Sequence, residues 1–181
     1  MTNNDTLRIR RATVADARAI AEISVRSWQT AYRGIMPDEF LAGMSIDARE
    51  VALASRLESD EADKAPAWVA DLGGAPIGFV SSGPPRDEDV PLPAAEIYAI
   101  YVLPSAWRRG AGRALMTAAL DEWQVRGVTT LVLWVLEANS KARSFYEAMG
   151  WTPDGRSQHI DFGAFERPEV RYRCQAKTPV R

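Results

Sequence analysis

A short basic turn with two glycines carries the residue types of an anion-binding site. Arg108, Arg109 and Arg113 surround Gly110 and Gly112 where a helix is expected to begin. A helix N-terminus carries partial positive charge and N–H groups without partners inside the helix, so three cations are unfavourable there unless an anion neutralises them. Glycines let such an anion approach the backbone closely. The residues alone leave two interpretations open, an anion site and a solvated basic turn.

The spacing of these glycines excludes two common phosphate-binding motifs. A dinucleotide fingerprint, Gly-x-Gly-x-x-Gly, needs a third glycine where Leu115 stands, and no Gly-x-x-x-x-Gly-Lys-Ser/Thr of a P-loop is present. Residues 96–115 run instead from an apolar strand through Pro104 and the basic turn to Gly-x-Gly-Arg-Ala-Leu. This order resembles the pyrophosphate loop of the GNAT N-acetyltransferases, which bind acetyl-coenzyme A (acetyl-CoA). One residue departs from the family pattern, because Trp107 stands where the loop usually begins with Gln or Arg.

A second segment adds to the resemblance. Residues 133–139 form an apolar run that ends in Asn139, and a short helical stretch with Phe145 and Tyr146 then leads to a glycine and an aromatic residue. GNAT enzymes carry a similar pattern after the cofactor loop, separated from it by one amphipathic helix. Two such segments in this order are stronger support than either alone, and they cover roughly residues 96–151.

The resemblance implies the fold. We expect an α/β (α+β) chain in one GNAT-like domain over residues 1–181, with an acetyl-CoA-binding core at about 95–151. The expected sheet is mixed and mostly antiparallel, with about six to seven strands and helices on both faces. The expected elements are a strand at 7–11, a helix after the capping box Thr13–Asp16, helical pieces from Pro37 and from Ser45, a hairpin at 67–81, a strand at 96–102, a helix ending near Gly127, a strand at 131–136, a helix from Asn139 or Ser140 to Gly150, a short strand from Trp151 and a strand around 170–174.

The sequence predicts how two further segments are exposed to solvent. Residues 83–93 are rich in proline and charge, which predicts a loop, either a spacer or a mobile lip over the site. Near the C-terminus, Val170, Tyr172 and Cys174 alternate with polar residues. This period of two predicts a strand with one buried face and one face in solvent.

The resemblance also implies the activity. We expect direct transfer of an acetyl group from acetyl-CoA to the primary amine of a small molecule, without a covalent enzyme intermediate. Transfer to a protein N-terminus or lysine is an alternative, and a non-catalytic acyl-CoA sensor is an alternative of another class. The cofactor-binding residues implied are Ile100, Tyr101, Val102, Arg108, Arg109, Gly110, Ala111, Gly112, Arg113, Ala114, Asn139 and Tyr146.

Two of these residues have specific implied roles and structural alternatives. Tyr146 would lie beside the sulfur of coenzyme A and protonate the departing thiolate. Asn139 would bond the pantetheine arm, which extends the central strand as a pseudo-strand, and a backbone N–H near Tyr101 or Val102 would stabilise the oxyanion. Equally, Asn139 can be a helix N-cap, and Tyr146 can be a core aromatic residue.

Acetyl transfer to an amine needs a base, because an amine with a pKa near ~10.4 arrives protonated. Glu96 is the predicted base, since it begins the central strand fourteen residues before Gly110, the offset of the strand-borne glutamate in similar enzymes. It would act directly or through a water, and a solvent-facing glutamate is the alternative. Glu137 is the reserve candidate. His159, the single histidine, is interpreted as structural or incidental.

The turn after the first helix supplies candidates for binding the acceptor. In similar proteins this turn usually walls the acceptor pocket, which makes Trp28, Tyr32 and Arg33 substrate-binding candidates. A core role for Trp28 and Tyr32 is the alternative. The sequence has no cluster with metal-ligand spacing, so no metal is expected.

The composition of the chain limits the kinds of molecule that it is expected to bind. With 181 residues, 46% of them hydrophobic, the chain can fill one core, and its net charge of −2 argues against a nucleic-acid surface. A single cysteine, Cys174, cannot form an internal disulfide and fits a reducing compartment. The first residues lack a signal-peptide pattern, and no apolar run reaches the ~20 residues that span a bilayer. We therefore expect a cytoplasmic protein without nucleic-acid or membrane partners; a homodimer remains open.

Overall fold

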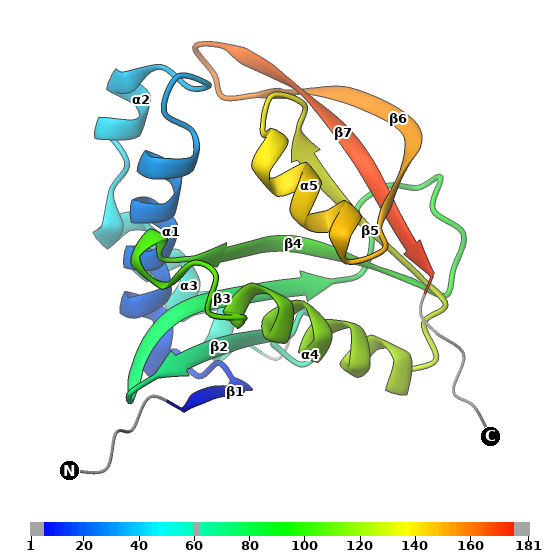
Figure 1. Ribbon diagram of the computed structural model, residues 1–181, viewed down its shortest axis with the longest axis horizontal. Coiled ribbons are helices and arrows are strands. Elements are labelled where there is room, and N and C mark those ends of the chain that lie inside the picture. Colours follow the sequence, from blue (N-terminus) through cyan, green and yellow to red (C-terminus); the bar gives the residue numbers. More distant parts are fainter. Residues whose placement is uncertain (1–5, 60–61, 176–181) are drawn as a thin grey trace.

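The computed structural model describes residues 6–59 and 62–175, which form a seven-stranded sheet with helices on both faces (Figure 1). The strand order is β1-β2-β3-β4-β5-β7-β6. This confirms the expected α/β (α+β) fold. The elements are β1 (Leu7–Arg11), α1 (Ala17–Ala31), α2 (Asp38–Ala42), α3 (Ile46–Glu58), β2 (Ala67–Leu72), β3 (Ala75–Gly83), β4 (Ala94–Val102), α4 (Ala111–Val125), β5 (Thr130–Leu136), α5 (Ser140–Ala148), β6 (Thr152–Asp161) and β7 (Glu166–Gln175).

The centre of the sheet opens between β4 and β5. Among the described strands these two form the one parallel pair, and every other neighbouring pair is antiparallel. They pair only from residues 94–97 to residues 130–133. Beyond this point β5 continues along β7, so residues 98–102 of β4 have no strand on their β5 side. The separation creates an opening lined by backbone groups of β4.

A β-bulge turns the side chains of β4 within this opening. The register between β3 and β4 shifts at Tyr98, which has no partner between Ile97 and Ala99. Ile97 and Ile100 both pack toward α4, although three residues separate them. Such a shift is the effect of a bulge, which adds one residue and re-aims those that follow. The bulge thus turns Tyr101 toward the α1 side, where it packs beside the core formed with that helix.

Helices cover the two faces of the sheet separately. Leu115 and Ala119 of α4 pack on β2, β3 and β4, whereas Ile20 of α1 packs with Phe79 of β3 on the opposite face. Each helix buries its apolar side against the sheet, as amphipathic helices of a layered domain do. No helix in the part of the chain that the structure describes is long and apolar enough to span a bilayer.

The loop between β3 and β4 is tied to the sheet by a buried arginine. Arg171 of β7, which is 5% exposed, donates hydrogen bonds to Asp87 (2.8 Å) and Asp89 (2.7 and 3.0 Å) of the loop. It also bonds Asp154 of β6 at 2.7 Å. The segment expected as a spacer or mobile lip, residues 83–93, is therefore a loop fixed over β7, which we call the loop wall.

Because of the loop wall, the prediction that one face of the last strand lies in solvent is wrong. Val170, Tyr172 and Cys174 of β7 pack on one core, as predicted, but the polar face of the strand is covered around Arg171 and Glu169, which is 7% exposed. The strand from Trp151 is also longer than expected, because β6 runs for ten residues beside β7.

Candidate functional site

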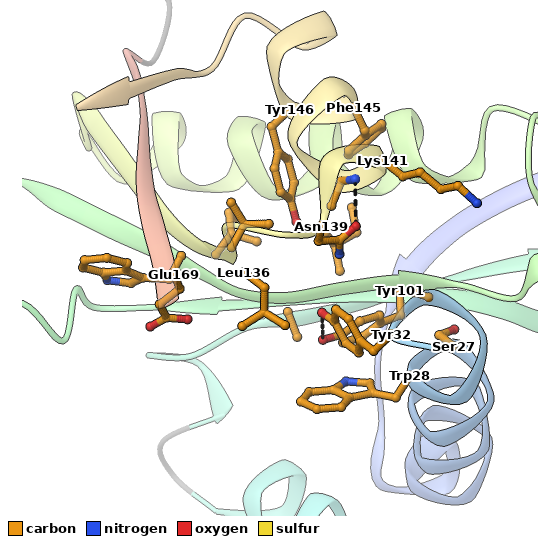
Figure 2. A pocket seen from close by; sticks show the side chains of 18 of the residues that line it. Ser27, Trp28, Tyr32, Tyr101, Leu136, Asn139, Lys141, Phe145, Tyr146 and Glu169 are labelled. Atoms are coloured by element: carbon orange, nitrogen blue, oxygen red, sulfur yellow. Dashed lines mark hydrogen bonds between the residues drawn. The ribbon is translucent and has the colours of Figure 1, made fainter. Parts of the chain in front are cut away.

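The opening between β4 and β5 leads into a cavity of about 1100 Å³. One end lies at the start of α4 and at α5, and the other lies between α1, β6 and β7. In Figure 2, Tyr146 projects from α5 toward the opening. Trp28 of α1 and Tyr32, which directly follows this helix, lie across from it, and Glu169 of β7 lies at the far end, beyond Leu136. A single cavity therefore connects the basic turn with a group of aromatic side chains.

The basic turn presents free backbone N–H groups at the start of α4. Gly110 has φ +82° and is the N-cap of the helix, a left-handed conformation that glycine adopts without strain. The first bond of the ladder runs from the Ala114 N–H to the Gly110 carbonyl at 3.0 Å. The N–H groups of Ala111, Gly112 and Arg113 therefore precede the ladder and lack helical partners. This arrangement suits a pyrophosphate.

The predicted loop residues fall into two groups. Arg108 and Arg113 line the cavity together with the glycines and Ala111. Arg109 and Ala114 do not, since Arg109 faces solvent and the Ala114 N–H is bonded within the helix. Arg108 itself has φ +63°, which is uncommon for a residue other than glycine. Two of the three arginines can thus meet an anion at the start of α4.

Trp107, the departure from the family pattern, closes the end of β4. Its indole N–H donates to the Val102 carbonyl at 2.8 Å, and the Lys141 ammonium lies 5.7 Å from the ring centroid. The ring is 41% exposed at the mouth of the cavity. The residue therefore covers the strand end with an apolar ring rather than a polar chain.

The free edge of β4 lines the middle of the cavity. Ile100, Tyr101 and Val102, predicted to contact the cofactor, all line it. Their β5 side has no strand partner, and an unpaired strand edge can accept an extended ligand through backbone hydrogen bonds.

Tyr146 and Asn139 lie on the other side of the opening. Tyr146 is 8% exposed and packs against Phe145, Trp151 and Tyr172. Burial raises the pKa of its hydroxyl, as does the nearby Tyr32, so the group is protonated at neutral pH and can donate a proton. The Asn139 side chain accepts the Ala142 N–H at 3.2 Å, which makes it the N-cap of α5, and it also lines the cavity. Asn139 is therefore a helix N-cap that also lines the cavity.

Glu96 is buried and held by an arginine. Its carboxylate is 0% exposed and accepts the Arg86 backbone N–H at 2.9 Å and the Arg86 Nε–H at 3.0 Å, with a further bond to Nη2. Arg86 lines the cavity and Glu96 does not. The arginine therefore stands between the predicted base and the space where an acceptor would bind.

Aromatic side chains form the end of the cavity between α1, β6 and β7. We call Trp28, Tyr32, Tyr101 and Phe162 the aromatic chamber. The Trp28 ring lies 4.7 Å from Tyr32 and 6.2 Å from Phe162, and the hydroxyls of Tyr32 and Tyr101 are 3.4 Å apart. Burial raises the pKa values of both tyrosines. The chamber is apolar, with two neutral hydroxyls beside the opening.

The remaining candidates differ in position. Trp28 and Tyr32 line the cavity as predicted for substrate residues, whereas Arg33 lies in the exposed turn after α1 and does not line it. His159 of β6 lines the far end. Glu137, the reserve base, is exposed after β5 and lies outside the lining.

Sequence reasoning missed Glu169. This residue lies opposite Leu136 in the β5–β7 ladder, is buried, and lines the cavity. Its carboxylate accepts the Gln158 amide at 2.7 Å. Burial raises its pKa, and nearby Glu96 adds to the rise while Gln158 and Arg86 oppose it. The signal available was its place on the polar face of β7, which the sequence pattern assigned to solvent.

Comparison with known proteins agrees with this geometry. A model of the acetyltransferase (GNAT) family matches residues 22–151. A probable N-acetyltransferase of Mycobacterium tuberculosis is 31% identical over 175 residues, 96% of each chain, and the uncharacterised N-acetyltransferase YuaI of Bacillus subtilis is 34% identical over 140 residues, 77% of each chain. The structure of the PaiA N-acetyltransferase of Thermoplasma acidophilum in complex with coenzyme A has the same fold, with a TM-score of 0.75 at 19% identity over 94% of this chain and 99% of that one.

Proposed function

Since the chain belongs to the acetyltransferase (GNAT) family and is an acyltransferase, we propose that it transfers the acetyl group of acetyl-CoA directly to the primary amine of a small molecule. One observation carries the proposal: a single cavity joins the basic turn to the aromatic chamber. A donor held at the turn and an acceptor held in the chamber would meet at the opening between β4 and β5.

The residues of the turn and of β4 suit the donor. The N–H groups before the α4 ladder and the side chains of Arg108 and Arg113 would hold the pyrophosphate. The free edge of β4 would hold the pantetheine arm, and a β4 N–H near Tyr101 or Val102 would stabilise the oxyanion. Arg109 would contribute charge at longer range, because it does not line the cavity.

The chemistry is a direct displacement. The neutral amine nitrogen attacks the thioester carbonyl carbon, the C–S bond breaks, and the sulfur leaves as a thiolate that takes the proton of the Tyr146 hydroxyl. The proton lost by the amine goes to a carboxylate, for which the sequence predicts Glu96. Because Arg86 stands between Glu96 and the cavity, Glu96 would have to act through a water or after Arg86 moves.

The aromatic chamber supports a small acceptor over a protein chain. Its rings come from α1, from β4 and from the end of β6, and those of Trp28, Phe40 and Phe162 pack on one another beside the cavity. Protein or peptide acetylation remains the alternative within the family, and a non-catalytic acyl-CoA sensor remains the alternative outside catalysis.

Two measurements test the proposal together. The first is thermal unfolding with and without acetyl-CoA, where a ligand at a hundredfold excess over Kd adds about 2.7 kcal/mol of stability. The second is release of free thiol with small primary amines and with peptides that carry a free N-terminus or a lysine. A raised Tm with turnover of small amines supports the proposal. Turnover of peptides only favours the protein alternative, a raised Tm without any turnover favours the sensor, and an unchanged Tm would overturn the enzyme assignment.

A further inference from the structure

The base of the reaction can be sought among the carboxylates that line the cavity. Three do so: Asp87, Asp161 and Glu169. Asp87 accepts hydrogen bonds from the Arg171 guanidinium (2.8 Å) and the Trp134 indole (2.9 Å). Asp161 is exposed and accepts the Gly163 N–H at 2.6 Å in the β6–β7 turn. Glu169 is the buried member of the three, and its hydrogen-bond partner is the neutral amide of Gln158.

Glu169 lies at the far end of the cavity, one strand away from the aromatic chamber (Figure 2). It faces Leu136 across the β5–β7 ladder, and paired strands lie about 4.8 Å apart. Leu136 packs with Tyr32 and Tyr101. The charge of Glu169 contributes to the raised pKa of Tyr32, after the larger effect of burial, and Tyr32 in turn affects Tyr146. Tyr32 therefore lies within electrostatic reach of both Glu169 and Tyr146.

The chamber between these groups favours an apolar body. Trp28, Tyr32, Tyr101 and Phe162 line the cavity with Leu136 and Ile160. Aromatic faces bind apolar groups and also attract an organic cation. A primary ammonium that enters this space would leave water, and Glu169 is the carboxylate placed to receive it.

We propose that the acceptor is a primary amine with an apolar, ring-sized body, which the aromatic chamber holds while Glu169 receives its ammonium group and takes one proton. The inference rests on the proposed function and names its acceptor class and base. In this reaction one N–H bond of the ammonium breaks and its proton moves to a Glu169 carboxylate oxygen. The nitrogen lone pair then forms the new bond to the acetyl carbon while the C–S bond breaks, the thiolate takes the Tyr146 proton, and the second proton lost by the nitrogen restores the Tyr146 hydroxyl. Glu96 then has a positioning role, because it holds Arg86 beside the cavity.

Several charged groups near Glu169 set how it titrates. Arg86 of the loop lowers its pKa, and Glu96 of β4 and Asp87 of the loop raise it, in addition to burial. His159 and Asp161 of β6 line the same end of the cavity. The raised pKa makes Glu169 a stronger base than an ordinary carboxylate, and it must be ionised to act. Activity should therefore rise with pH as Glu169 loses its proton.

The acceptor class is tested with three amines of similar length in a free-thiol assay: phenethylamine, butane-1,4-diamine and β-alanine. We expect phenethylamine to have a kcat/KM at least ~10-fold above the other two, which is the discrimination that about 1.4 kcal/mol of binding gives. Higher activity with the diamine or β-alanine overturns the acceptor class while leaving the proposed function intact. The class is also overturned if none of the three reacts although acetyl-CoA raises the Tm. Failure of both acetyl-CoA binding and turnover overturns the proposed function itself.

The base is tested with Glu169→Gln, Glu96→Gln and Glu166→Gln. Glu166 is the matched control, since it is an exposed glutamate at the start of the same strand. We expect Glu169→Gln to lower kcat/KM for phenethylamine by ~10²–10⁴-fold and to remove the acidic limb of the pH profile. The Glu96→Gln and Glu166→Gln proteins should keep that limb.

A second readout separates catalysis from folding. Glu169→Gln removes a buried charge, so its Tm at pH 7 should be equal to that of the parent or higher, and the Tm increase on acetyl-CoA binding should persist. A Glu169→Gln protein with near-parental activity, or loss of the acidic limb in Glu96→Gln instead, would overturn the assignment.

Discussion

At the scale of single residues, the hydroxyl of Tyr146 decides whether α5 takes part in chemistry or only in packing. Its ring packs with Trp151 and Tyr172, and its buried hydroxyl stays protonated at neutral pH. For Tyr146→Phe we expect a kcat lower by ~10²-fold with unchanged calorimetric affinity for coenzyme A, because the ring contacts remain.

Tyr172→Phe is the matched control for this change. Tyr172 belongs to the same ring cluster, but its hydroxyl bonds Glu147 (2.7 Å) and Arg143 (3.1 Å). Its loss should lower stability and leave kcat unchanged. Equal losses of binding and turnover in Tyr146→Phe would assign Tyr146 a packing role.

Residue motifs predicted the starts of α4 and α5 better than the far end of the cavity. Gly110 and Asn139 stand in local patterns, and the structure shows both at the helix starts that these patterns predicted. Arg86 meets Glu96, ten residues further along the chain, only when the loop between β3 and β4 folds back on β4, and Glu169 comes near both from β7. No local pattern signals such a meeting, so the shielding of Glu96 was not predictable from the sequence.

At the scale of elements, the start of α4 distinguishes two arginines that the sequence treats alike. Arg113 lines the cavity, and Arg109 does not. We expect Arg113→Glu to weaken coenzyme A binding by ~10-fold or more, since a carboxylate would face the anion. Arg109→Glu should weaken it less, and calorimetry on both proteins measures the difference. Equal effects would mean that the anion contacts the turn from another side.

The loop wall offers a second test at this scale. Arg171 holds Asp87, Asp89 and Asp154 together, so Arg171→Met leaves three carboxylates without their common partner. Because these aspartates are partly exposed, we expect a loss at the low end for a broken buried ion pair, about 3 kcal/mol, in denaturant unfolding. The KM for the amine should rise, since Arg86 and Asp87 lie in this loop. Unchanged unfolding would show that the loop packs without these ion pairs.

Periodicity identified the elements but not what covers them. The alternation along β7 correctly placed Val170 and Tyr172 on one face, where both pack on the core. A period of two assigns residues to faces, but it does not reveal that another loop lies on one face. The sequence therefore predicts a spacer or a mobile lip at residues 83–93, although Arg171 binds Asp87 and Asp89 of this segment.

At the scale of the whole molecule, paired carboxylates predict how stability depends on pH. Hydrogen bonding to Arg10 lowers the pKa of Asp16, and hydrogen bonding to Arg171 lowers the pKa of Asp89 to about 2. A carboxyl whose pKa is lower when folded stabilises the fold above its unfolded pKa. That contribution disappears as pH falls, for Asp89 between about pH 4 and pH 2.

We therefore expect the Tm to fall steeply below about pH 4. Glu169 acts in the opposite direction, because its raised pKa makes the folded state bind the proton more tightly. Thermal unfolding at a series of pH values measures the net effect of these carboxyl groups on stability. In Asp89→Asn the acid-induced decrease should be smaller, and an identical pH profile would mean that the ion pairs with Arg171 do not form in solution.

Because β4 and β5 separate, the sheet has a gap at its centre that an extended ligand such as acetyl-CoA would fill. Every second peptide N–H of residues 98–102 points away from β3, toward a place where residues 6–59 and 62–175 supply no strand. These amides should exchange with deuterium quickly in the free protein and slowly once acetyl-CoA is added, whereas those of residues 94–97 should be slow in both states. If the two groups exchanged alike with and without acetyl-CoA, the donor would not lie along this edge. With acetyl-CoA along this edge, the substrate would act as a temporary strand, and each turnover would complete the middle of the sheet and open it again.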